Sequence, residues 1–245
     1  MASSTDRHTL RSVRADILVL PSPLLPASAY EGLADALRDQ GRDVTLASAT
    51  LAHGEGAADL VERWSALAGP GLLVVAHSNA GFAAPAVRSC SEGSRLVFVD
   101  AALPPETGST TLASDGFYAH LASLADEHGV LPPWTRWWPR DDLAGVIPEA
   151  RFDELDRSCP RLPLRYFQGR LTPPPGWATR SSAYLAFAGI YAEELVFARE
   201  HGWPVEVLDG RHSHFLHDPV TVAQRVLALD GAMRAGEQGP PEWPA

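Results

Sequence analysis

The sequence contains only two cysteines among its 245 residues, Cys90 and Cys159. Two thiols are too few for the disulfide framework of a small secreted domain, and their spacing matches no zinc-binding motif. We therefore expect both to be reduced thiols with a structural role. The sequence predicts neither a metal nor a cofactor.

Basic clusters and long apolar runs are also missing. Thirty acidic residues against twenty basic ones give a net charge of -10, and no basic run supplies the positive surface that nucleic-acid binding requires. No apolar stretch reaches membrane-spanning length, and none of signal-peptide length precedes the first strand-like segment. We expect a soluble, cytoplasmic protein whose partner is a small-molecule substrate, not nucleic acid or a membrane. The sequence leaves open whether the protein forms a homodimer.

What the sequence does contain is an alternation of short apolar runs and amphipathic segments, in a chain whose length suits one globular domain. Near-continuous Val and Leu runs are typical of strands buried on both faces, as in parallel sheets covered by helices. The sequence therefore predicts an α/β domain with a mostly parallel sheet flanked by helices. The expected strands lie at residues 15–20, 43–48, 71–77, 95–100, 162–169 and 204–210, and residues 181–202 are expected to be helical.

The alternation breaks between Leu103 and Pro160, where the chain is richer in proline and tryptophan and poorer in strand patterns. Such a break indicates an insertion into the regular α/β pattern. We expect residues 1–102 and 161–234 to form the core, residues 103–160 to form a cap over it, and residues 235–245 to be a polar tail.

Ser78 lies where an apolar strand turns directly into a helical segment, in the stretch LLVVAHSNAGF. Such a turn strains the backbone of the serine and requires small residues two positions away on each side, here Ala76 and Ala80. It would expose the hydroxyl at the carboxyl edge of the sheet, beside a helix N-terminus that favours a developing anion. A serine that only caps the following helix would give the same pattern. The serine alone leaves both interpretations open.

A histidine-rich loop, GRHSHFLHDP, follows the last predicted strand and precedes the last predicted helix. The loop should return to the sheet edge where Ser78 lies, so the chain order serine, acid, histidine is available. His212 is the best-placed candidate, and His214 and His217 compete with it. A metal site is the weaker interpretation, because no carboxylate pattern accompanies the three histidines.

With these two segments the chain resembles the α/β-hydrolases, with VVAHSNAG as the nucleophile elbow and GRHSHFLHDP as the histidine loop. The likeness extends from Ala15 to Leu229, and the overall pattern is similar to serine α/β-hydrolases of high-GC bacteria. The resemblance implies the α/β-hydrolase fold with a small cap, Ser78 as nucleophile and His212 as base.

The acid departs from the common pattern of that family. It usually stands three residues after the glycine that ends the strand predicted at 162–169, where this chain has Thr172 in a loop without any carboxylate. Some haloalkane dehalogenases take the acid from the end of the preceding strand, where this chain has Asp100. A buried carboxylate there needs a partner, which a histidine would supply. Asp100 is therefore the predicted acid, with a strand-end cap as the alternative interpretation and Asp209 in reserve.

The resemblance implies acyl-transfer chemistry in which Ser78 attacks a carbonyl, His212 moves the proton and Asp100 orients the histidine. Dehalogenation is not expected, because it needs an aspartate nucleophile. Backbone amides should hold the oxyanion, with Asn79 as the first donor. The loop VLPSPLLPAS should supply the second, and since its prolines have no N–H, Leu24 is the expected donor.

The sequence thus predicts a serine hydrolase of an ester, thioester or lactone. The alternatives are a non-hydrolytic enzyme of the same fold, such as a cyclase or a lyase, and a catalytically inactive binding protein. Aromatic side chains clustered in the cap favour an apolar acyl group, although they would equally serve to seal the cap onto the sheet. The expected substrate-binding side chains are Phe117, Tyr118, Trp134, Trp137 and Trp138.

Overall fold

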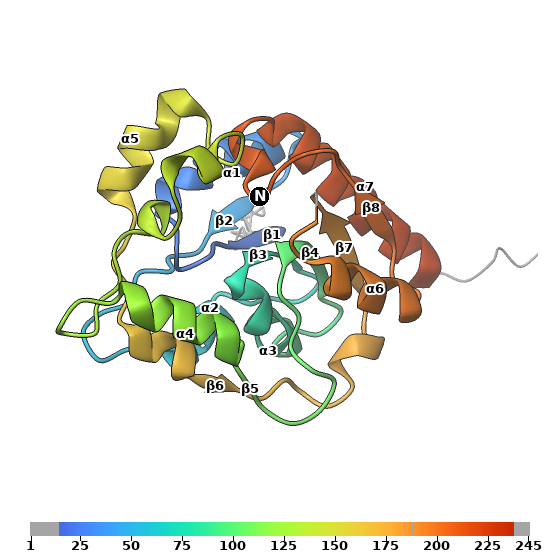
Figure 1. The fold of residues 1–245 in the computed structure, drawn as a ribbon. Helices are drawn as coiled ribbons and strands as arrows, with labels where there is room; N and C mark the ends of the chain where they lie inside the picture. Colours follow the sequence, from blue (N-terminus) through green and yellow to red (C-terminus); the bar gives the residue numbers. More distant parts are fainter. Residues whose placement is uncertain (1–14, 188, 238–245) are drawn as a thin grey trace, which may run out of the picture.

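The computed structural model describes residues 15–187 and 189–237. At its centre is a six-stranded sheet in the order β2-β1-β3-β4-β7-β8, in which every neighbouring pair is parallel (Figure 1). All residues of β1, β3, β4 and β7 are buried, which is why β1, β3 and β4 consist mainly of apolar residues. The predicted α/β class is confirmed. The strands are β1 (Ile17–Leu20), β2 (Val44–Leu46), β3 (Leu73–Ser78), β4 (Arg95–Ala101), β7 (Ser182–Ala186) and β8 (Val205–Val207).

Helices cover both faces of this sheet. The contacts join α1 with α7 and α2 with α3, and Figure 1 shows the two pairs on opposite faces. The helix after the histidine loop starts with a side-chain cap, since the Asp218 carboxylate accepts the Thr221 N–H at 2.9 Å and Pro219 occupies the first turn. These helices are α1 (Glu31–Asp39), α2 (Ala57–Ser65), α3 (Ala84–Ser89), α6 (Ala192–Glu200) and α7 (Pro219–Glu237).

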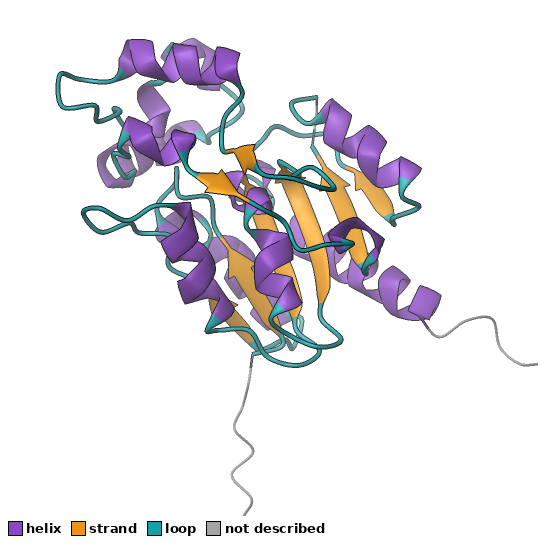
Figure 2. Cartoon of the chain, turned by 90° about the horizontal axis from the view of Figure 1, so that it is seen from below, coloured by secondary structure: helices purple, strands orange, loops and turns teal. Residues whose placement is uncertain are grey.

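Between β4 and β7 the chain leaves the parallel sheet and builds a separate layer. Figure 2 shows helices of this layer beyond the carboxyl ends of the strands. Its main elements are α4 (Asp115–Leu124), α5 (Glu149–Ser158) and a two-stranded antiparallel sheet of β5 (Thr110–Thr111) and β6 (Arg170–Leu171). Among the helices of the described ranges, none is both long enough and apolar enough to cross a membrane.

Two predicted elements are wrong in this part of the chain. Residues 162–169 do not form a strand; they contain the 3-10 helix Leu164–Gln168, whose Tyr166 and Phe167 are buried. The parallel sheet resumes instead at β7, inside the segment expected to be helical. The alanine-rich sequence of β7 favours a helix locally, but its pairing with β4 on one side and with β8 on the other overrides that preference.

The predicted boundaries of the core, the cap and the tail stay predictions where they lie outside the described residues. Helix α7 continues through Glu237, past residue 235 where a polar tail was expected. Residues 238–245 of that tail lie outside the described residues, as do residues 1–14. The division into cap and core at Pro160 remains a prediction, and the segment between β4 and β7 extends as far as Ser181.

Candidate active site

Ser78 ends β3 and leads directly into the 3-10 helix Asn79–Phe82. Its φ of 57° lies in the left-handed region that residues with a side chain rarely adopt. Ala76 and Ala80 are buried on either side. A Cβ on Gly81 would overlap the carbonyl oxygen of Ala102, so only glycine lets this helix approach β4 so closely. The sharp turn predicted around the serine is present.

Asp100 owes its position to an irregularity in β4. The pairing of β3 with β4 shifts between His77 and Ser78, which leaves Asp100 as an extra residue of β4 with a φ of 41°. A bulge of this kind bends a strand and redirects a side chain. The Asp100 side chain is buried, and its Oδ1 accepts the Phe187 N–H at 3.0 Å.

His212 lies between these two residues and bonds to both. Its Nδ1 is 2.8 Å from Oδ2 of Asp100, and its Nε2 is 3.0 Å from Oγ of Ser78. The carboxylate only accepts, so Nδ1 carries the proton and Nε2 accepts the serine hydroxyl. Three segments far apart in the sequence thus bring a hydroxyl, an imidazole and a carboxylate into one line. This arrangement can activate a hydroxyl as a nucleophile.

The competing candidates lie elsewhere. The ring of His214 packs against Phe187 at 5.6 Å between centroids, and the exposed His217 packs against His214. Asp209 and Thr172 are both exposed to solvent. Among the described residues, no group of three His, Cys, Asp or Glu side chains could hold a metal ion.

His77, next to Ser78, forms a hydrogen bond with the backbone of His212. Its Nε2 donates to the backbone carbonyl of His212 at 3.0 Å, so its Nδ1 accepts the hydroxyl of Tyr30 at 2.8 Å. The same hydroxyl accepts the Ser22 N–H at 2.9 Å. Burial, with a smaller contribution from His212, holds the pKa of His77 well below its ordinary value of 6.5. The neutral ring therefore joins the histidine loop to the end of β3.

This buried histidine predicts a loss of stability in mild acid. Below pH 6.5 the unfolded chain takes up a proton at His77 that the folded protein does not. The contribution of neutral His77 to the free energy of unfolding is therefore fully present above pH 6.5 and decreases as the pH falls. The free energy of unfolding should fall by about 1.4 kcal/mol per pH unit from this group. Urea unfolding at several pH values between about 7.5 and 5.5 would measure it, with His77→Gln as the comparison. Parallel pH profiles for the two proteins would contradict the prediction.

The two predicted oxyanion donors differ in their surroundings. The Asn79 N–H belongs to the first residue of a 3-10 helix, a position where the helix itself offers no acceptor. The side chain of Asn79 is engaged, since it donates to Leu112 O at 3.1 Å and accepts the Tyr166 hydroxyl at 2.7 Å. The Leu24 N–H points within its own loop, to Oγ of Ser22 at 3.4 Å. Its role as the second donor remains a prediction.

Four of the five aromatic side chains predicted to bind substrate, all except Tyr118, form a connected cluster beside His212. The ring centroids of Trp134 and His212 are 6.5 Å apart, and Trp134 contacts Trp138 at 5.7 Å. Trp137 joins Trp138 at 5.8 Å and Phe117 at 6.1 Å. Tyr118 is half-buried and packs against the core. The cluster thus extends from the candidate active site into the layer between β4 and β7.

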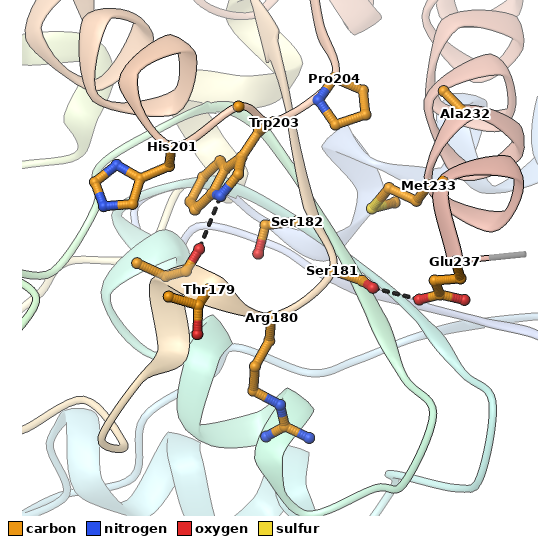
Figure 3. Close-up of a pocket in the computed structure, with 13 residues that line it drawn as sticks. Thr179, Arg180, Ser181, Ser182, His201, Trp203, Pro204, Ala232, Met233 and Glu237 are labelled. Carbon is orange, nitrogen blue, oxygen red and sulfur yellow. Dashed lines mark hydrogen bonds between the residues drawn. The ribbon is translucent and has the colours of Figure 1, made fainter. Parts of the chain in front are cut away.

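A surface hollow of about 360 Å³ lies apart from these residues, between the 3-10 helix Trp177–Thr179 and the ends of α6 and α7 (Figure 3). Trp203 lines it and donates its Nε1 proton to Ala178 O at 2.9 Å, and the Ser181 hydroxyl bonds to Glu237. Its lining contains none of Ser78, Asp100 and His212. This hollow is therefore separate from the candidate active site.

Comparison with known proteins bears on the fold. Neither a scan against protein-family models nor a search of the curated proteins finds a match. The structure is similar to an extracellular α/β-hydrolase from a Paenibacillus species, with a TM-score of 0.65 and 15% identity over 87% of this chain and 98% of that one. This chain has the α/β-hydrolase fold. The Paenibacillus protein is described as sharing structural and functional homology with tobacco salicylic acid binding protein 2.

Other proteins of the α/β-hydrolase fold are similar over equally large parts of their chains. A pyrethroid hydrolase from Sphingobium faniae JZ-2 has a TM-score of 0.59 and 18% identity, over 89% of this chain and 98% of that one. Tomato methylketone synthase I, complexed with 2-tridecanone, has a TM-score of 0.60 and 12% identity, over 90% of this chain and 99% of that one. At these identities the likeness establishes the α/β-hydrolase fold, and the function has to be argued from the site.

Sequence reasoning missed one residue of this site. Tyr191 ends the loop between β7 and α6, and its ring lies 5.6 Å from the ring of His212. The sequence predicts that residues 181–202 are helical, and it contains no turn signal at Tyr191. Only the position of β7 beside β4 brings Tyr191 to the carboxyl edge of the sheet.

Proposed function

We propose that this protein is a serine hydrolase that cleaves an ester, thioester or lactone with an apolar acyl group. The observation that carries the proposal is the position of His212, within hydrogen-bond distance of both the Ser78 hydroxyl and the Asp100 carboxylate. The α/β-hydrolase fold supports it, because in this fold a nucleophile on a sharp strand-to-helix turn meets a histidine loop at the same sheet edge. Fold alone would not settle the reaction.

In the proposed reaction Ser78 attacks the carbonyl carbon while its proton passes to Nε2 of His212. The Asn79 N–H donates to the oxyanion that forms, and Asp100 stabilises the imidazolium without taking its proton. His212 then protonates the departing alkoxide or thiolate. Water attacks the acyl-enzyme by the same path in reverse, and the acid leaves as Ser78 recovers its proton.

The surroundings of Ser78 favour an apolar acyl group. Trp134, Trp137 and Trp138 form a continuous aromatic cluster that begins beside His212, and aromatic side chains that line a site bind apolar groups. Ser78 is only 3% exposed and His212 only 8%. A substrate therefore needs a side chain over the site to move before its carbonyl can reach Ser78.

A non-hydrolytic reaction at the same site is the second candidate. The observation in its favour is the loop after β1, where Pro21 and Pro23 have no N–H and the Leu24 N–H is directed to Ser22. An oxyanion with a single amide donor is held less well, since one lost donor typically costs roughly 100- to 1,000-fold in rate. A proton-transfer, cyclisation or lyase reaction directed by His212 would depend less on that donor.

Isotope labelling separates the two candidates. We expect short-chain aryl esters or acyl thioesters to be turned over with burst kinetics, and one oxygen from heavy-oxygen water to enter the released acid. A panel of esters, thioesters and lactones followed by mass spectrometry measures this. Consumption of a substrate with no label in any product would exclude hydrolysis for that reaction and favour the second candidate.

A further inference from the structure

The loop that joins β7 to α6 contacts two of the three proposed catalytic groups. At its start the Phe187 N–H donates to Asp100 at 3.0 Å. At its end Tyr191 precedes the first residue of α6, and its ring lies 5.6 Å from the His212 ring at an angle of 47°. The loop is therefore placed to act on the reaction as well as to hold the acid.

The side chain of Tyr191 lies against the imidazole ring that bonds to the nucleophile. Ser78 is near enough to Tyr191 to lower its pKa, while burial raises that pKa by more. The net pKa lies well above the ordinary value, so the phenol keeps its proton and acts as a donor. Tyr191 is half-buried and packs against the core, which restricts where its hydroxyl can point.

During the reaction the acceptor available to the Tyr191 hydroxyl changes. In the free enzyme the Ser78 hydroxyl donates to His212, and its oxygen can accept from Tyr191. Once the oxygen of Ser78 has bonded to the carbonyl carbon, it becomes an ester-type oxygen and a poorer acceptor. The leaving-group oxygen then lies beside Nε2 of His212, next to the ring that Tyr191 contacts.

We propose that Tyr191 is a further catalytic residue, whose hydroxyl donates a hydrogen bond to the leaving-group oxygen. The inference rests on the proposed function, because it needs Ser78 as nucleophile. As the bond from the carbonyl carbon to that oxygen breaks, its electron pair goes to the oxygen, and the proton arrives from His212. Tyr191 keeps its own proton throughout. In the second half of the reaction the attacking water occupies the same position, so the same hydroxyl holds the water.

Leaving-group dependence tests this assignment without requiring turnover. Two phosphonate probes share one alkyl phosphonyl group and release either phenoxide or p-nitrophenoxide when Ser78 attacks phosphorus. Phenoxide is the more basic leaving group and gains more from a hydrogen bond. Tyr191→Phe should slow labelling by the phenyl probe roughly 10- to 100-fold, the range for one hydrogen bond to a developing charge, and by the p-nitrophenyl probe about 3-fold or less. Intact-protein mass spectrometry measures both rates.

Tyr184→Phe is the matched control, because it also removes a buried tyrosine hydroxyl near the site. That hydroxyl donates to Ala101 O at 2.8 Å and is not directed at Ser78. We expect Tyr184→Phe to change both probe rates by the same factor. Equal slowing of both probes in Tyr191→Phe, or slowing of neither, would overturn the role of Tyr191 and leave the proposed function intact. Failure of both probes to label the unmodified protein would instead refute Ser78 as nucleophile, and the role of Tyr191 with it.

Discussion

Replacing Ser78 by alanine should lower hydrolysis by roughly 10⁴- to 10⁶-fold, the range for loss of the nucleophile in enzymes of this type. The alanine keeps the small volume of the buried turn but removes the only atom that can attack the carbonyl. A fluorophosphonate probe should label the unmodified protein at Ser78 and fail to label Ser78→Ala. Kinetics on an aryl ester and mass spectrometry of the labelled peptide measure the two effects.

The control for this experiment is a serine outside the site. Ser89 ends α3 and is exposed to solvent, so Ser89→Ala should keep both activity and labelling. Thermal melting would show whether Ser78→Ala remains folded. Labelling that persists unchanged in Ser78→Ala would remove Ser78 from the mechanism.

The substitution Asp100→Asn should lower turnover by about 10⁴-fold while the fold survives. Because Oδ1 of Asp100 accepts the Phe187 N–H, the amide oxygen of asparagine would take that place and turn its NH₂ group towards His212. Nδ1 of the histidine would then have to accept, and its proton would move to Nε2. Nε2 could no longer take the proton of Ser78, so the nucleophile would lose its base.

Asp209→Asn is the matched control, since Asp209 is an exposed aspartate on the same loop as His212. We expect it to leave turnover within about 2-fold, as surface changes away from a site usually do little. The informative contrast is the ratio of kcat between the two variants. Near-normal kcat in Asp100→Asn together with a large loss in Asp209→Asn would move the acid's role to Asp209.

Local patterns in the sequence were enough for most of the fold. Strands β1, β3 and β4 are apolar runs bounded by polar residues, and such runs indicate strands that are buried on both faces. The pattern failed at β7 because its alanines favour a helix when considered locally. It failed again at Leu164–Gln168, where Phe167 packs against Phe117 and Trp137 and not within the sheet.

The residues of the candidate site also fall into those predicted from local sequence and those placed by the tertiary structure. The sequence by itself predicted a serine on a sharp turn and a histidine loop after the last strand, because both patterns depend on small residues and glycines nearby in the chain. Only the tertiary structure decided between the predicted acids by placing Asp100 against His212, and it alone brings Tyr191 beside the His212 ring. Those contacts depend on a bulge in β4 and on which strand lies beside it, and pairing between strands distant in sequence leaves no local trace in either one.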